Sequence, residues 1–307
     1  MDVIGIGGAN IDIHGKSKRP IVMRDSNPGI LHLSAGGVTR NILENVTKLG
    51  LSTSLLSAVG DDIYGTMILA NCKTVGIRTE HLAVLPQERS SSYISIMDDE
   101  GDMLIAMSDM DILKAMGKEF IEERLPALQN CKLCICDGNL SASAIEAILE
   151  HASTPVFCDP VSTAWAKALV PYAHKFYALK PNKLEAEVLS GIAITNETTL
   201  QDAANTLLQK GLSEIYISLG ADGIFYKDRA GNTYHKKSRP LKTIINATGA
   251  GDAAMAGIVY GTLHNLSYQE KVHFALASSI VALQGYNTIN ENMCVKTVQR
   301  TIKEFII

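Results

Sequence analysis

The chain has 307 residues, of which 46% are hydrophobic and 20% are charged. This composition is ordinary for a soluble globular enzyme, and it excludes a disordered or low-complexity protein. The 28 basic and 32 acidic residues give a net charge of −4 without a block of like charge, so we expect small-molecule partners and no nucleic acid.

The first residues, MDVIGIGGANIDIHG, lack the basic region, apolar core and small-residue cleavage site of a secretory signal. No stretch of about 18 apolar residues offers a membrane span. We therefore expect a cytoplasmic protein with no membrane partner. The length is compatible with one large α/β domain or with one domain and a small appendage.

Short apolar runs followed by helical periodicity recur along the chain, which is typical of βαβ units. The predicted strands lie within residues 2–8, 52–60, 132–138, 155–160, 175–182 and 214–220. The sequence therefore predicts an α/β fold with a mainly parallel sheet.

Two glycine motifs near the first strand do not predict a nucleotide site. GIGGAN at residues 5–10 has Asn10 where a dinucleotide-binding fingerprint needs its last glycine, and IDI then continues as a strand. Gly15-Lys16-Ser17 resembles the end of a P-loop, but Asn10 again replaces the glycine required five positions earlier.

Residues 13–34 and 88–108 interrupt this rhythm, because they are richer in polar residues and turns. The second segment alternates between apolar and polar residues on both sides of a DEGD turn. We predict that both segments form extra strands of a lid outside the main sheet. An ordinary surface hairpin is equally compatible with the pattern.

Polar clusters follow four of the predicted strands, at residues 137–139, 159–160, 180–182 and 218–220. Because ligands of open α/β sheets bind at the carboxyl ends of the strands, these clusters should converge on one crevice.

Three nearby cysteines invite a metal-site interpretation, namely Cys131, Cys134 and Cys136. No second cysteine pair or histidine completes four ligands, so the apolar run around Cys134 and Cys136 favours a buried strand.

The stretch NATGAGDAAMAGIVYG at residues 246–261 places Asp252 after a glycine-rich turn and before a small-residue helix. Such a turn exposes amide N–H groups at a helix N-terminus, which suits an anion such as a phosphate. Asp252 then has two interpretations. It is either a partner of the helix dipole or a base that takes a proton from an attacking hydroxyl during phosphoryl transfer.

NATGAGD resembles the second signature of the ribokinase-like (PfkB) carbohydrate kinases, and AGGVTRNILENVTKLGLSTSLLSAVGDDIYG resembles the first. The resemblance extends over essentially the whole chain, including the GxANID strand and the KPNKLE segment. It implies a three-layer ribokinase-like fold with a mainly parallel central sheet and a small β lid, in a single domain over residues 1–307. It also implies ATP-dependent phosphorylation of an alcohol, with Mg²⁺ as cofactor.

The resemblance assigns roles to individual residues. It makes Asp252 the catalytic base, and Gly249, Ala250 and Gly251 the anion hole. The residues matching those that hold the sugar hydroxyls are Asn10, Asp12, Gly36, Gly37 and Asn41. Those matching the ATP contacts are Asn182, Ser218, Gly220 and Gly223, and Glu185 of the NxxE motif is associated with Mg²⁺ through water.

A K⁺ site is also implied, but the chain departs from the family pattern there. Asn246 stands where the family often has Asp beside the anion hole. Thr248 and nearby carbonyl groups still offer oxygen ligands, so both a K⁺-dependent and a K⁺-independent enzyme stay open.

The lid stretches at residues 25–29, 89–106 and 108–112 resemble the pseudouridine kinases of this family, which phosphorylate the ribose 5′-hydroxyl of a C-nucleoside. The candidate substrate contacts in the lid are Asp25, Ser26, Asn27, Ser91, Ser92 and Tyr93. Another nucleoside, ribose or fructose phosphate remain alternative substrates, and an inactive nucleoside sensor is the alternative from another class. Exposed edges of the lid would favour a homodimer.

Overall fold

The computed structural model describes residues 1–307. The strands of its larger sheet are β1 (Val3–Ile6), β4 (Thr53–Gly60), β5 (Leu82–Leu85), β8 (Leu133–Asp137), β9 (Val156–Asp159), β10 (Ala178–Leu179), β11 (Glu214–Ser218), β12 (Ile224–Asp228) and β13 (Thr233–Lys236). The nine strands follow the order β13-β12-β11-β10-β9-β8-β1-β4-β5. Those from β11 to β5 are parallel, and β12 and β13 are antiparallel. Each of the six predicted runs contains one of these strands.

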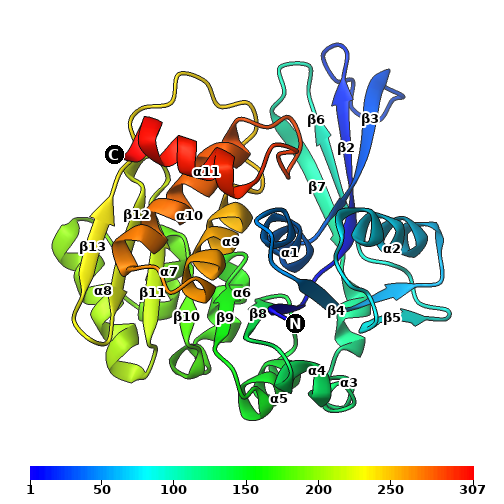
Figure 1. The fold of residues 1–307 in the computed structure, drawn as a ribbon. Helices are drawn as coiled ribbons and strands as arrows, with labels where there is room; N and C mark the ends of the chain where they lie inside the picture. The colour runs from blue at the N-terminus through cyan, green and yellow to red at the C-terminus, as the bar shows by residue number, and fades with distance from the viewer.

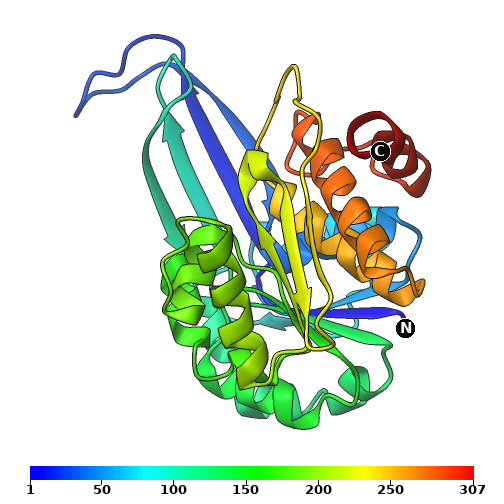
Figure 2. The same ribbon diagram turned by 90° about the vertical axis from the view of Figure 1, so that its left-hand side faces the viewer.

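Helices cover both faces of this sheet (Figure 2). One face carries α1 (Val38–Lys48), α2 (Ile63–Val75), α9 (Ala250–Leu263), α10 (Tyr268–Leu283) and α11 (Val295–Thr301), whose apolar side chains form one core cluster. The other face carries α3 (Lys118–Glu122), α4 (Leu125–Gln129), α5 (Ala142–His151), α6 (Thr163–Leu169), α7 (Lys183–Ser190) and α8 (Glu197–Lys210), which belong to a second cluster.

Successive strand residues alternate between the two core clusters. Val3 of β1 packs in the first cluster and Ile4 in the second, as the pleat of a strand requires. Both faces of the sheet are therefore apolar, and the predicted strands read as continuous apolar runs for this reason. The three-layer α/β fold is confirmed.

A second sheet has the order β3-β2-β6-β7. Its strands are β2 (Asn10–Ser17), β3 (Gly29–Gly36), β6 (Ser92–Met97) and β7 (Met103–Asp109). The two segments predicted to leave the main sheet thus form a sheet of their own, which extends away from the layered core (Figure 1). The sheet starts at Asn10, three residues earlier than predicted, and β2 includes the GKS sequence that mimics a P-loop.

The two faces of the second sheet differ in chemistry, because side chains alternate along each strand. The face that carries Asp12, which we call the Asp12 face, is polar around Asp12 and carries Ile30 and Met97 at the far end of the strands. The opposite face, which we call the apolar face, carries Ile13, Leu31, Leu33, Ile94, Ile96, Ile105 and Met107. Leu31 is 69% exposed and Met107 is 70% exposed, so the chain itself does not cover the apolar face.

Cys134 and Cys136 lie fully buried in β8, which confirms the strand predicted there. None of the helices combines the length and the apolar character needed to cross a membrane.

Candidate active site

The N-terminus of α9 has the form expected of an anion-binding turn. Its N-cap Gly249 has a φ of 83°, and a Cβ at this position would overlap the carbonyl oxygen of Thr288, so only glycine fits. The amides of residues 249–252 donate to no protein group. These unpaired donors and the positive end of the helix dipole make a cradle for an oxyanion.

Asp252 lies in the first turn of α9 beside this cradle. Asn41 of α1 donates from Nδ2 to Asp252 Oδ2 at 2.9 Å, although the two residues are 211 positions apart. The fold therefore brings the segment of the first signature against the acid of the second.

The surroundings of Asp252 raise its pKa to about 7. Burial among packed neighbours is the largest cause, and the negative charge of Asp159 is the next. The hydrogen bond from Asn41 and the charges of Lys180 and Arg40 oppose the shift. A carboxyl group with a pKa near neutrality can accept and return a proton, which is the property that general-base catalysis needs.

Lys180 lies at the carboxyl end of β10 and faces the same cradle. Its Nζ is 3.0 Å from Asp159 Oδ2, and each of the two residues is only 5% exposed. A Cβ placed on Gly251 would lie 3.5 Å from Lys180 Nζ. Burial alone would lower the pKa of Lys180, but the charges of Asp159, Glu185 and Asp252 outweigh it and raise the pKa. The predicted convergence of the strand ends is confirmed for these groups.

Lys180 had no assigned role in the sequence analysis, although its strand-end position was a signal. Its ammonium group is a fixed positive charge next to the unpaired amides, where a migrating phosphoryl group would need one.

Asn182 and Glu185 form a capping box at the start of α7. Glu185 accepts from the Asn182 amide at 2.9 Å and from Nδ2 at 2.8 Å, and its own amide donates to Asn182 Oδ1. Burial raises the pKa of Glu185, and the hydrogen bond from Asn182 opposes the shift. Glu185 therefore also stabilises the start of α7.

The same residues also suit the outer coordination of Mg²⁺. The structure contains no cluster of three or more His, Cys, Asp or Glu side chains that could enclose a metal. Mg²⁺ bound with ATP needs few protein ligands, because phosphates and water supply the rest. One buried carboxylate, Glu185, beside the cradle fits this requirement.

The turn between β11 and β12 follows Ser218, the last residue of β11, and contains Gly220 and Gly223. Gly220 has a φ of 61° and Gly223 a φ of 86°. A Cβ on Gly223 would overlap the carbonyl oxygen of Lys236, so this turn also requires glycine. Ser218 donates its amide to Pro181 at 2.9 Å, which places the turn beside the KPN segment.

Asn246 connects two loops beside the α9 N-terminus. Its Nδ2 donates to the carbonyl of Tyr286 at 3.2 Å, and its Oδ1 accepts from the Thr248 amide at 2.9 Å. Both ends of the Asn246 amide are thus engaged at the candidate K⁺ site.

The residues expected to hold sugar hydroxyls lie where the second sheet meets α1. Asn10 donates from Nδ2 to Asp12 Oδ1 at 2.6 Å, and burial raises the pKa of Asp12. A Cβ on Gly36 would overlap the Asp12 carboxylate, and one on Gly37 would overlap the Gly8 carbonyl oxygen. Gly36 therefore leaves room for the Asp12 carboxylate, and Gly37 lets α1 approach the Gly8 carbonyl.

Arg40 holds these residues together, and no sequence motif pointed to it. It is 1% exposed. Its guanidinium donates to the carbonyls of Ala35 and Gly36, to Glu44 and Asn71, and to Asn41 Oδ1. Every N–H of the guanidinium is used. The bond to Asn41 Oδ1 turns Asn41 Nδ2 toward Asp252. A buried arginine is rare, but nothing in the sequence alone marks this one as buried.

The lid candidates are only partly brought to the site. Asp25, Ser26 and Asn27 lie in the loop beyond Ser17, at the end of β2 remote from Asp12, and within one chain they do not approach Asp252. Ser92 pairs with Ile11 and lies on the apolar face, the face opposite to Asp12, because side chains alternate along the strand. Tyr93 lies on the Asp12 face.

Ser91, which precedes β6, is 1% exposed and its hydroxyl has no hydrogen-bond partner. Such a group costs free energy unless a ligand or water satisfies it. By alternation it lies on the same face as Tyr93.

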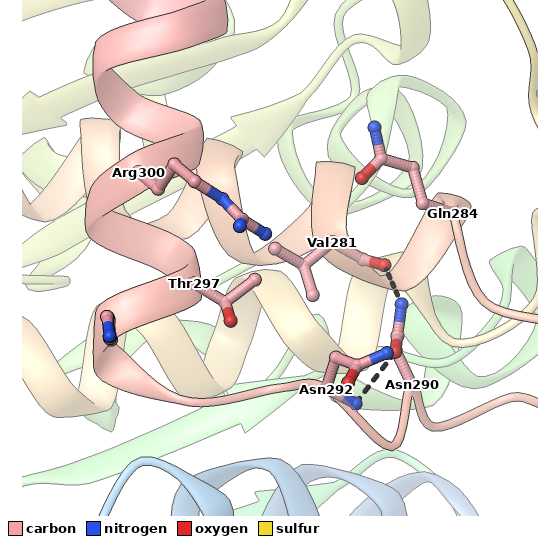
Figure 3. A pocket seen from close by; sticks show the side chains of 7 residues that line it. Val281, Gln284, Asn290, Asn292, Thr297 and Arg300 are labelled. Atoms are coloured by element: carbon pink, nitrogen blue, oxygen red, sulfur yellow. Dashed lines mark hydrogen bonds between the residues drawn. The ribbon is translucent and has the colours of Figure 1, made fainter.

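A separate cavity of about 460 Å³ lies between the end of α10 and α11 (Figure 3). It is lined by Val281, Gln284, Asn290, Asn292, Lys296, Thr297 and Arg300. Asn290 is tied to the Val281 carbonyl at 2.6 Å and to the Asn292 amide at 2.9 Å. None of the site residues expected from the sequence lines this cavity.

The profile of the pfkB family carbohydrate kinases matches residues 2–293. The chain belongs to the pfkB family of carbohydrate kinases. It is therefore a phosphotransferase with an alcohol group as acceptor.

Individual relatives agree with this membership. The chain is 40% identical over 299 residues to pseudouridine kinase of Escherichia coli strain K12, which covers 96% of this chain and 95% of that protein. The structure of a protein described as a sugar kinase from Clostridium perfringens matches with a TM-score of 0.89 at 31% identity, over 99% of this chain and 96% of that one.

A structure described as ribokinase II from Escherichia coli, solved with ATP and Mg²⁺, matches with a TM-score of 0.84 and covers 99% of both chains. Its identity is 18%, so it shows the shared fold alone.

Proposed function

We propose that this pfkB kinase transfers the γ-phosphoryl group of ATP to the 5′-hydroxyl of pseudouridine, giving pseudouridine 5′-phosphate and ADP. The observation that carries the chemistry is Asp252, held by Asn41 beside four unpaired amides and with a pKa near 7. The 40% identity to a pseudouridine kinase supports the choice of acceptor.

In the proposed reaction, Asp252 takes the proton of the acceptor hydroxyl as its oxygen attacks the γ-phosphorus and the bond to the β-phosphate oxygen breaks. The amides of Gly249, Ala250 and Gly251 hold the equatorial oxygens, and Lys180 adds positive charge. Asp12 and Asn41 hold the ribose hydroxyls, with Gly36 and Gly37 leaving them room.

The nucleotide would lie along the strand ends from Asn182 to Ser218, against the turn of Gly220 and Gly223. Mg²⁺, held by Glu185 through water, would neutralise phosphate charge when bound. The second sheet would act as a lid and keep water from the phosphoryl group.

A panel of acceptors tests the proposal. The purified chain is assayed with ATP and Mg²⁺ against pseudouridine, uridine, cytidine, adenosine, ribose and fructose phosphate. The highest kcat/KM is expected for pseudouridine. A preference for ribose or for another nucleoside would contradict the substrate, and nucleoside binding without turnover would favour the sensor. An intact cradle and Asp252 argue against a sensor, which needs neither.

The bonds of Asn246 bear on the candidate K⁺ requirement. Its amide bridges Tyr286 and Thr248, so these two loops beside the α9 N-terminus are held together without a cation. We therefore expect activity to vary less than about twofold among K⁺, Na⁺ and a buffer without alkali cations, which corresponds to about 0.4 kcal/mol. A severalfold loss on K⁺ removal would restore K⁺ as a cofactor.

The apolar face of the second sheet supports a homodimer. It exposes Leu31, Ile105 and Met107, and a second copy presents the same face, so a two-fold axis pairs the two apolar surfaces. Sedimentation should show a dimer that Met107→Glu converts to a monomer. A wild-type monomer at micromolar concentration would exclude this assembly.

A further inference from the structure

The Asp12 face carries further polar side chains next to the ribose-binding candidates. It carries His14 one step along β2 from Asp12, and the register pairs Asp12 with Tyr93 and His14 with Ser95 of β6. Ser95 is 1% exposed, and Asp12, His14 and Tyr93 are half-buried. These polar side chains therefore lie together on a sheltered part of the face, where a ligand held by Asp12 would meet them.

His14 and Ser95 form a preset pair on this face. His14 Nδ1 lies 2.6 Å from Ser95 Oγ. The Tyr93 ring stands edge-on to the His14 ring, with the centroids 6.5 Å apart. The two nitrogens of a neutral imidazole have opposite roles. If the Ser95 hydroxyl donates to Nδ1, Nε2 carries the proton and is a free donor.

The position of this pair relative to Asp252 follows from the strand geometry. Asp12 lies beside Gly36, whose carbonyl binds Arg40, and the neighbouring Asn41 donates to Asp252. Successive residues on one face of a strand are about 6.6 Å apart, so His14 lies one such step beyond Asp12 along β2. A nucleoside with its ribose hydroxyls at Asp12 would lay its base along His14 and Ser95.

We propose that His14, oriented by Ser95, recognises a carbonyl group on the edge of the nucleobase, and that the Tyr93 ring flanks the base. This inference rests on the proposed function, because it takes a nucleoside as the acceptor. A pyrimidine such as uracil presents ring carbonyls, which are the acceptors that a His14 Nε2–H would bind. Ribose and fructose phosphate lack this group, so the pair would set the preference for nucleosides over sugars.

The experiment measures Kd by calorimetry and kcat/KM for pseudouridine and ribose with the full chain. His14→Ala and Ser95→Ala should each weaken pseudouridine binding about tenfold, the loss of one hydrogen bond, and leave the values for ATP and ribose unchanged. His14→Gln, whose amide can also donate, should recover part of the loss. Ile94→Val, on the same strand but the apolar face, is the matched control and should have wild-type affinity.

Two results would overturn the inference. One is wild-type affinity for pseudouridine in both alanine variants, and the other is an equal loss for ribose. If the wild-type chain binds no nucleoside, the proposed function and the inference both fail. If the wild type binds pseudouridine but the variants behave as described above, only the inference fails. Thermal melting of each variant shows whether it is folded.

Discussion

Lowering the pH below 7 should remove activity by protonating Asp252, since its surroundings raise its pKa to about 7. A general base acts only in its ionised form. Below this pKa the ionised fraction falls about tenfold for each pH unit, so kcat/KM at pH 6 should be about a tenth of its plateau at high pH. An unperturbed aspartate, with a pKa of about 4, would give a flat profile over this range.

The contacts of Asp252 predict how variants move this profile. Asn41 donates to the carboxylate and favours its charged form. Asn41→Ala should therefore raise the apparent pKa and displace the profile to higher pH, whatever it does to ribose binding. Asp252→Asn should lower kcat about 10²–10⁴-fold, the usual contribution of a general base, and leave the Kd for the nucleoside largely unchanged.

The assay is a coupled measurement of ADP release from pH 5.5 to 9, with coupling enzymes in excess at each pH. A profile that is flat down to pH 5.5, an Asn41→Ala profile with an unmoved midpoint, or near-normal turnover in Asp252→Asn would each refute the assignment of the base.

Thermal unfolding offers a measurement independent of turnover. Because the pKa of Asp252 is higher in the fold than the ordinary value of 3.8, the folded chain binds more protons than the unfolded chain between about pH 4 and 7. Its contribution to stability therefore falls as the pH rises through this window. Asp252→Asn removes the cost of ionising the buried carboxylate, so it should raise the Tm at pH 8 by about 2–4 °C for each kcal/mol of stability gained. The increase should be smaller at pH 5, where Asp252 is largely protonated. An Asp252→Asn Tm below that of the wild type at pH 8 would contradict the shift.

Three further substitutions follow from the site. Gly249→Ala should abolish most activity and destabilise the fold by more than Gly191→Ala. Gly191 also has a positive φ but open space around it, so it is the control. Similar urea midpoints for the two variants would contradict this prediction. Arg40→Met should cost about 3–5 kcal/mol in urea unfolding, because it leaves the buried Glu44 unpaired, and Glu44→Gln should cost less. Lys180→Met should lower kcat and raise the apparent pKa seen in the pH profile, and an unmoved midpoint would separate Lys180 from the base.

The sequence predicts the elements whose signals are local. The strands of the main sheet are apolar runs because both faces are buried, and their lengths and spacing read directly as βαβ units. The cradle at α9 is equally local, since a positive φ at Gly249 and the small residues after it are written in consecutive positions.

What the sequence could not predict depends on contacts between distant segments. Arg40 is buried only because β3, α1 and α2 meet around it, and its neighbours in the sequence give no sign of this. Ser92 illustrates a second limit, because a shift of one residue along a strand reverses the face on which a side chain lies. The loop at residues 25–27 illustrates a third, since composition does not tell how far a hairpin carries its tip from the site.

The two interpretations of Asp252 make opposite demands on its electrostatics. A carboxylate that only balances the dipole of α9 gains from being ionised, so its surroundings should lower its pKa. Here burial and the charge of Asp159 act against ionisation, and they outweigh Asn41, Lys180 and Arg40. Ionisation of Asp252 therefore destabilises the folded state, and a role in stabilising the helix does not explain this. A base that must gain a proton during each turnover and then lose it requires just this balance, which is why the environment of the acid supports catalysis over helix stabilisation.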